Sequence, residues 1–319
     1  MLLEDSVTIV LDGKEQVAAV CGSNDGNLKA IESVLGGRLA ARGNEVRMEG
    51  LDGAKARRFR EVMDGLVSAA RNGEPPSPEF ARALAGGTEG DGADAEAILA
   101  GCINIPHGFN RVFPRTGNQA AYVRDIRQSD ITFCVGPAGT GKTYLAIACA
   151  LSLVLSKKTR KLVLTRPVVE AGESLGFLPG DLAQKINPYL RPLYDAMEAL
   201  IPSEVIRRME DSRAIEIAPL AYMRGRSLND AFIILDEAQN TTKEQMKMFL
   251  TRLGTDSRAV IAGDATQIDL PKRDASGLLH ALSILKDIDG IRFSFLNSTD
   301  VVRNPLIKKI IQAYDEEKR

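Results

Sequence analysis

The sequence has few of the residues that build metal centres and disulfide frameworks. Its 319 residues include four cysteines, which lie far apart and form no C-x-x-C pair, and two histidines. A zinc site is therefore not expected, and the cysteines are predicted to be reduced residues of the core.

Long apolar runs and a secretory leader are also lacking. The longest apolar run, Leu145 to Leu155, is too short to cross a bilayer. The first residues carry two acids and none of the basic side chains that open a secretory signal. We therefore expect a cytoplasmic protein with no membrane partner.

The charges are balanced. The net charge is −1 and the pI is near 6.2, so no overall basic field attracts nucleic acid, and any such binding needs a local patch. Hydrophobic content of 44% and charged content of 26% are typical of an ordinary globular protein, and the length favours two domains.

Three regions differ in composition. Residues 1–72 are predicted to form a small α+β unit. Residues 73–109 have few apolar side chains and many Gly, Ala and acidic residues, which predicts a flexible linker and lead-in with one short helix at 78–85. Residues 110–319 alternate strand-like and helix-like runs, the pattern of an α/β domain whose parallel sheet is covered on both faces. Its strands are expected at 131–135, 161–165, 215–218, 232–235, 259–262 and 291–295.

The strongest motif is GPAGTGKT, which lies between an apolar strand-like run and a helix-like run and matches the phosphate-binding loop G-x-x-x-x-G-K-[ST]. Its glycines let backbone N–H groups approach phosphate oxygens, and the helix that follows adds a partial positive charge. Lys142 is expected to reach the β- and γ-phosphates of ATP, and the Thr143 hydroxyl to hold Mg²⁺. The predicted nucleotide-binding residues are Gly136, Pro137, Ala138, Gly139, Thr140, Gly141, Lys142 and Thr143.

Two adjacent acids end a second apolar strand, in FIILDEAQ at residues 232–239. Asp236 is the candidate Mg²⁺ ligand, and Glu237 is placed to accept a proton from an attacking water. Such acids can also simply cap the next helix. Beside a phosphate loop, the catalytic interpretation is favoured.

A third motif, GDATQID at residues 263–269, also follows an apolar strand, and its Gln267 is the candidate sensor of the γ-phosphate. In this order, the three motifs resemble the ATPase core of superfamily 1 helicases. The resemblance implies that Gln119 reads adenine. It also places Arg166 and Glu170 where those helicases contact a nucleic-acid strand, although both residues could instead brace the nucleotide site.

Longer stretches resemble the PhoH family of cytoplasmic ATPases. They are TRPVVEAGESLGFLPGDL, NPYLRPLYDA, IEIAPLAYMRGRSL, DAFIILDEAQNTTKEQMKMFLTRLG, GDATQIDLP and DVVRNPLI. The resemblance covers nearly all of residues 110–319. It implies a RecA-like P-loop NTPase domain with ATP and Mg²⁺ as cofactors.

The small unit resembles an RNA-binding KH domain in GSNDGNLKAIESVLGGRLAARGNEVRMEG. A KH domain clamps the nucleic-acid backbone with G-x-x-G, whereas here three residues separate Gly22 from Gly26, and one of them is Asp25. Nucleic-acid binding and a structural or oligomerisation role both remain open for this unit.

A superfamily 1 motor uses a second lobe to supply an arginine to the γ-phosphate, and the chain after Asp269 is too short for one. We therefore expect either slow hydrolysis or an arginine donated by a neighbour in a homo-oligomeric ring, which by analogy would be a hexamer. Arg303 is the first candidate for this catalytic arginine, and Arg224 and Arg226 are the alternatives.

Two classes of function follow. The first is an ATPase that acts on or with RNA. The second is a nucleotide-gated scaffold that recruits a partner such as a ribonuclease and has little motor activity. A small-molecule kinase is a weaker interpretation, because Glu237 and Gln267 suit activation of water.

Overall fold

The computed structural model describes residues 6–73, 75–86, 95–107, 109, 111–167, 182–272 and 275–301. The chain forms two compact units. Unit 1 comprises Met1–Asn104 and Arg111–Ala121, and unit 2 comprises Ile105–Asn110 and Tyr122–Arg319. The helix predicted at 305–314 lies outside the described residues.

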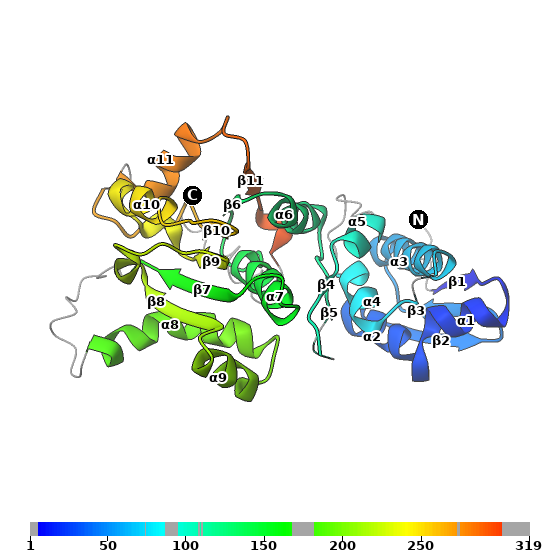
Figure 1. Ribbon diagram of the computed structural model, residues 1–319. Coiled ribbons are helices and arrows are strands. Elements are labelled where there is room, and N and C mark those ends of the chain that lie inside the picture. Colours follow the sequence, from blue (N-terminus) through cyan, green and yellow to red (C-terminus); the bar gives the residue numbers. More distant parts are fainter. Residues whose placement is uncertain are drawn as a thin grey trace. The chain divides into compact units, whose positions relative to one another are not determined.

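Unit 1 is built on a three-stranded antiparallel sheet with the order β1-β3-β2 (Figure 1). Val46 and Met48 of β3 are buried while Glu45, Arg47 and Glu49 are exposed, so one face of the sheet packs on helices and the other meets solvent. In chain order the elements are β1 (Ser6–Val10), α1 (Gly13–Cys21), η1 (Ser23–Asp25), α2 (Gly26–Leu35), β2 (Arg38–Arg42), β3 (Glu45–Glu49) and α3 (Gly53–Arg71). The loop predicted to resemble a nucleic-acid clamp joins α1 to α2.

Part of the range predicted as linker packs into the core of unit 1. Helix α4 (Pro78–Ala85) begins at Ser77, whose Oγ accepts a hydrogen bond from Phe80 N at 3.3 Å. Phe80 and Ile98 are fully buried, and the rings of Phe80 and Phe113 lie 5.4 Å apart. These large apolar side chains bury enough surface to order a stretch whose overall composition is polar. The remaining elements here are α5 (Ala95–Ala100), β4 (Ile103–Asn104) and β5 (Arg111–Val112).

Unit 2 contains a six-stranded sheet with the order β11-β6-β10-β9-β7-β8, and all neighbouring strands are parallel. The six strands predicted from the sequence are all present. The strands are β6 (Ile131–Val135), β7 (Lys161–Arg166), β8 (Ile215–Pro219), β9 (Ala231–Leu235), β10 (Arg258–Gly263) and β11 (Ile291–Phe295). The fold is therefore the expected α/β architecture, consistent with a RecA-like P-loop domain.

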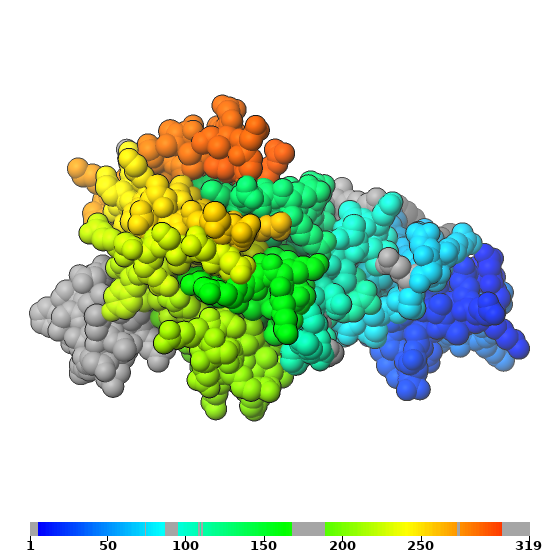
Figure 2. All heavy atoms as spheres, viewed as in Figure 1, coloured from blue at the N-terminus to red at the C-terminus, as the bar shows by residue number. Residues whose placement is uncertain are grey.

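Helices cover both faces of this sheet (Figure 1). One face packs on α7 and α8, and the alternate side chains Ile233, Leu235 and Ile261 pack on α10 and α11 with Phe249 and Leu278. Helices α10 and α11 form part of the surface shown in Figure 2, in yellow and orange. The helices are α6 (Gly117–Gln128), α7 (Lys142–Leu155), α8 (Leu182–Glu198), α9 (Ser203–Asp211), α10 (Lys243–Leu250) and α11 (Gly277–Ile284), with the short turns η3 (Leu220–Met223), η4 (Ala238–Asn240) and η6 (Ser298–Asp300).

The described residues bear on two sequence expectations, the state of the cysteines and the presence of membrane-spanning helices. The four cysteines are free, and Cys21, Cys134 and Cys149 are buried, while Cys102 is half-buried. Among the described helices, none combines the length and the apolar character needed to cross a membrane.

Candidate nucleotide site

The phosphate loop joins β6 to α7 at the carboxyl end of the sheet. Gly139 and Gly141 have φ angles of 81° and 84°, in the left-handed region that favours glycine. Gly136 is constrained differently, because a Cβ there would lie 2.6 Å from the backbone oxygen of Leu296. The chain after β11 therefore packs directly against the start of the loop.

Lys142 lies at the centre of the loop. Its Nζ donates hydrogen bonds to the carbonyl oxygens of Gly136 at 2.6 Å and Pro137 at 2.8 Å. Burial lowers the pKa of this amino group. The Thr140 hydroxyl donates to Pro137 O at 2.8 Å, and the buried Tyr122 hydroxyl donates to Lys142 O at 3.1 Å. The carbonyl groups of the loop therefore hold the Lys142 amino group in place.

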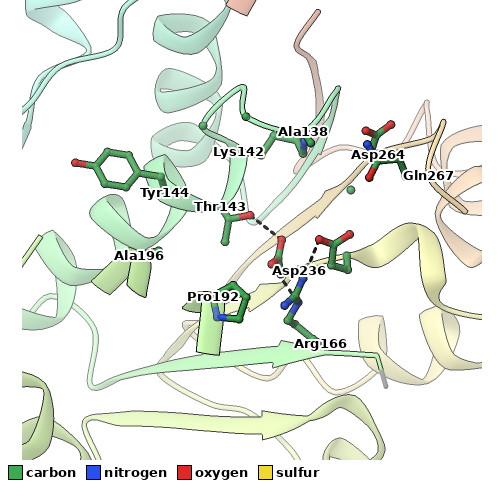
Figure 3. A pocket seen from close by; sticks show the side chains of 14 residues that line it. Ala138, Lys142, Thr143, Tyr144, Arg166, Pro192, Ala196, Asp236, Asp264 and Gln267 are labelled. Carbon is green, nitrogen blue, oxygen red and sulfur yellow. Dashed lines mark hydrogen bonds and ion pairs between the residues drawn. The ribbon is translucent and has the colours of Figure 1, made fainter. Parts of the chain in front are cut away.

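The two acids of the DEAQ motif follow β9, which lies between β7 and β10. The Thr143 hydroxyl donates to Asp236 Oδ1 at 2.6 Å, so the phosphate loop and the acidic strand end are in direct contact (Figure 3). Asp236 is only 7% exposed, and burial raises the pKa of its carboxyl group while the neighbouring Arg166 opposes that rise.

Arg166, the last residue of β7, bridges both acids. Its Nε lies 3.3 Å from Asp236 Oδ2, and its Nη2 lies 2.8 Å from Glu237 Oε1. Its Nη1 donates to the carbonyl oxygen of Tyr189 in α8 at 2.7 Å. Of the two roles that the sequence left open for Arg166, its position in this structure matches the bracing of the nucleotide site.

A hydrogen-bond chain connects Glu237 to the loop after β10. The Gln239 amide donates from Nε2 to Glu237 Oε2 at 2.6 Å, and its Oε1 accepts from Asp264 N at 2.9 Å. Glu237 has a φ of 52°, an uncommon conformation for this residue that the network around it holds. Gln239 is the last residue of the DEAQ motif. The sequence alone did not indicate that its side chain would bridge the two strand ends.

One pocket is lined by the phosphate loop, both acids and Arg166 (Figure 3). Gln267 lines it from the loop after β10, beside Asp264, while Tyr144 lies beyond Thr143 and points away from the acids. Pro192 and Ala196 of α8 form a further part of the wall. The pocket therefore combines the loop, both acids and Gln267, which lie far apart in the sequence.

The donor set at Thr143 and Asp236 fits Mg²⁺. One hydroxyl and one carboxylate oxygen lie 2.6 Å apart, and both are hard oxygen ligands. No group of three or more His, Cys, Asp or Glu side chains within the described residues is arranged to enclose a metal ion. Mg²⁺ suits such an open site, because it normally retains water and takes its remaining ligands from substrate phosphates.

The other predicted site residues have different positions. Gln119 belongs to unit 1, where its Oε1 accepts from Arg115 N at 2.7 Å, so the structure does not locate it relative to the phosphate loop. Arg303 and Glu170 lie outside the described residues. Arg226 forms a two-pronged ion pair with Glu216, including an Nη2–Oε2 contact of 2.8 Å, whereas Arg224 is exposed after η3.

Comparison with known proteins places the chain in a family. A family model described as PhoH-like protein matches residues 111–315. The "PhoH-like protein" of Mycobacterium tuberculosis (strain ATCC 25618 / H37Rv) is 49% identical over 300 residues, which cover 93% of this chain and 84% of that protein. The "PhoH-like protein" of Bacillus subtilis (strain 168) is 44% identical over 308 residues, 96% of each chain. "Protein PhoH" of Escherichia coli (strain K12) is 41% identical over 206 residues, 64% of this chain and 58% of that protein. The chain therefore belongs to the PhoH family.

Proposed function

We propose that this protein binds ATP together with Mg²⁺ and hydrolyses the γ-phosphate. The observation that carries the proposal is the contact between Thr143 and Asp236, which joins the phosphate loop to the acidic end of β9 within one pocket. A glycine turn beside a surface lysine would not bury Lys142 or direct it at the loop interior.

Each residue of the pocket has a defined task in this proposal. Thr143 and Asp236 would hold Mg²⁺, which when bound neutralises charge on the phosphates. Lys142 would exchange its two loop carbonyls for phosphate oxygens, and Gln267 would contact the γ-phosphate. Glu237 would take a proton from the attacking water, held in place by Arg166 and Gln239.

Replacing Glu237 by Gln tests the catalytic part of this proposal. The change keeps the shape of the side chain and one of its two acceptor oxygens, replaces the other by an NH₂ group, and removes the ability to accept a proton. We expect the turnover number for ATP to fall by about 10²- to 10⁴-fold with little change in the dissociation constant of ATP. Phosphate release and equilibrium nucleotide binding would be measured on the same preparation. Unchanged turnover would exclude Glu237 as the base.

We further propose that hydrolysis is completed by an arginine from a second copy of the chain in a homo-oligomer. Arg226 is already paired with Glu216, whereas Arg224 is described and exposed, so Arg224 is the better placed of these two to reach a second copy. An arginine supplied in this way can raise turnover by ~10³ to 10⁵-fold. Arg303 remains the other candidate.

RNA is the proposed partner of the ATPase. The support is the resemblance of unit 1 to a KH domain, whose α1–α2 loop exposes Ser23, Asn24 and Asp25, and the exposed Lys157, Lys158 and Arg160 after α7. In the alternative, the nucleotide state controls recruitment of a ribonuclease and RNA does not affect turnover.

One titration tests the oligomer and the RNA partner together. Turnover per chain is expected to rise with protein concentration, and to rise again when single-stranded RNA is added at low salt. Arg224→Ala should remove the concentration dependence, whereas Arg207→Ala, at another exposed arginine, should retain it. A flat concentration profile would argue against a donated arginine, and turnover that is indifferent to RNA would favour the scaffold alternative.

A further inference from the structure

Arg166 pairs one guanidinium with both acids of the DEAQ motif. Its Nε lies 3.3 Å from Asp236 Oδ2, and its Nη2 lies 2.8 Å from Glu237 Oε1. The side chains of Arg166 and Asp236 are only 15% and 11% exposed, so water does little to stabilise their charges. The Asp236 carboxylate therefore depends on a neighbouring cation, and in this structure Arg166 supplies it.

The guanidinium of Arg166 is fixed in place. Its remaining nitrogen, Nη1, donates to the carbonyl oxygen of Tyr189 in α8 at 2.7 Å. All three nitrogens thus have an acceptor, and the planar fork of arginine loses little conformational freedom in such an arrangement. Arg166 is therefore a positive charge that is held at one place beside the acids.

The proposed Mg²⁺ ligands include the same carboxylate. The Thr143 hydroxyl lies 2.6 Å from Asp236 Oδ1, whereas the Arg166 guanidinium faces Oδ2. A metal ion held by Thr143 and Asp236 would therefore share one carboxylate with a cation that already neutralises it. Two cations on one buried carboxylate repel each other, and the low exposure of the site strengthens that repulsion.

The charges that line the pocket lead to the same conclusion. Lys142 and Arg166 contribute two positive charges, and three negative charges come from Asp236, Glu237 and Asp264, so the ionised pocket has a net charge of 2 − 3 = −1. In the described part of the chain, no cluster of three or more acidic, His or Cys side chains is arranged around a metal position. The chain by itself thus offers a divalent cation little attraction and few ligands, whereas a triphosphate would add both negative charge and oxygen ligands.

We propose that Arg166 takes the place of the divalent cation in the nucleotide-free pocket and thereby makes Mg²⁺ binding depend on the triphosphate. This inference rests on the proposed function, because it takes Thr143 and Asp236 as the metal ligands. Without nucleotide, the guanidinium satisfies both acids, and the pocket gains little from a second cation. With nucleotide, the phosphate oxygens supply the charge and the ligands that Arg166 withholds. The metal ion therefore enters with ATP or after it.

Arg166→Gln tests this inference by removing the charge while keeping a planar polar side chain. Mn²⁺ is the probe, and its binding in the absence of nucleotide would be followed by electron paramagnetic resonance. We expect the variant to bind Mn²⁺ alone at least about 10-fold more tightly than the parent does, and Mn²⁺ alone to raise its melting temperature more. ATP binding in EDTA should weaken about 3- to 10-fold, because a cation near the triphosphate is lost. The two ligands thus respond in opposite directions, which a general loss of the pocket would not produce.

Three further variants serve as controls. Arg191 also contacts two acids, Asp195 at 2.7 Å and Glu198 at 3.3 Å, but it is exposed and outside the pocket lining. Arg191→Gln should therefore bind Mn²⁺ as the parent does. Arg166→Lys keeps the positive charge and should bind Mn²⁺ alone nearly as weakly as the parent. Adding Asp236→Asn to Arg166→Gln should remove the gained Mn²⁺ binding, because the carboxylate that holds the metal is lost.

The outcomes separate this inference from the proposed function. If the parent binds ATP with Mn²⁺, but Arg166→Gln binds Mn²⁺ alone no better than the parent, the inference fails and the proposed function stands. If the parent binds Mn²⁺ as tightly without ATP as with it, the inference fails as well. If Arg166→Gln binds neither Mn²⁺ nor ATP, Arg166 only supports the fold and the inference is again wrong. If the parent does not bind ATP with or without Mn²⁺, both proposals fall.

Discussion

Replacing Lys142 by Ala is expected to abolish ATP binding at working concentrations and to lower turnover by about 10³-fold or more. The change removes the only charge that the phosphate loop itself carries, from a position where burial excludes water and strengthens each contact to phosphate. It also leaves the carbonyl groups of Gly136 and Pro137 without their donor, so the loop loses its internal support. Equilibrium binding of ATP and phosphate release would show both effects.

The matched control is Lys158→Ala, at an exposed lysine just beyond the other end of α7. It removes the same charge at a distance from the phosphate loop and should leave ATP binding unchanged. Lys142→Arg is not expected to restore activity, because a planar guanidinium does not fit the place of a compact ammonium between two carbonyl oxygens. An Lys142→Ala protein that binds and consumes ATP as the parent does would refute the assignment of the whole site.

Replacing Gly136 by Ala is expected to destabilise unit 2 by about 3 kcal/mol or more. An added Cβ would lie 2.6 Å from Leu296 O, 2.8 Å from Leu296 Cβ and 3.0 Å from the Leu296 carbonyl carbon. Two of these atoms belong to the backbone, so no side-chain rotation relieves the clash. The strain falls on the hydrogen bonds that join this region, from Gly136 N to Gly263 O and from Leu296 N to Val135 O.

Urea unfolding, monitored by one signal for each unit, would measure this loss in unit 2 and the effect of the control in unit 1. Gly53→Ala is the control, because a Cβ there meets no atom within 4 Å and the glycine has no positive φ. Alanine in the first turn of α3 should be neutral or slightly stabilising. If Gly136→Ala unfolds at the same urea concentration as the parent, the close approach of the Leu296 backbone does not constrain the loop.

The strands of unit 2 were predictable because burial on both faces makes them short, continuous apolar runs. The sequences ITFCV and AFIIL show this clearly, and the motifs that follow them mark where each strand ends. The positions of the GPAGTGKT loop, Asp236 and Glu237 directly after strands could be predicted for the same reason, while their roles stay predictions.

Elements with mixed or exposed surfaces were missed. Strand β2 (RLAAR) is exposed along almost its whole length at the sheet edge, so no alternation of buried and exposed residues marks it. Helix α6 is largely polar in sequence although much of it is buried, including Tyr122, Val123 and Ile126, so its hydrophobic pattern is weak. Helix α1 is short and only its last residues, Val20 and Cys21, are buried.

The network around the acids could not be predicted, because it depends on the order of the strands in the sheet. The pairing of β9 with β7 brings Arg166 to Asp236 and Glu237, and the pairing of β9 with β10 brings Asp264 to Gln239. Both neighbours are distant in sequence from the DEAQ motif. Sequence spacing alone gives no preference for this order over others.

Gln239 has a mechanical consequence beyond the chemistry of the pocket. Its side chain ties Glu237 to Asp264, and its own carbonyl oxygen accepts a hydrogen bond from the Ser276 hydroxyl at 2.8 Å, immediately before α11. A displacement of either acid must therefore break a buried hydrogen bond or carry the start of α11 with it, and breaking one costs about 1–3 kcal/mol. If binding of the proposed nucleotide displaces either acid, we therefore expect the start of α11 to move with it.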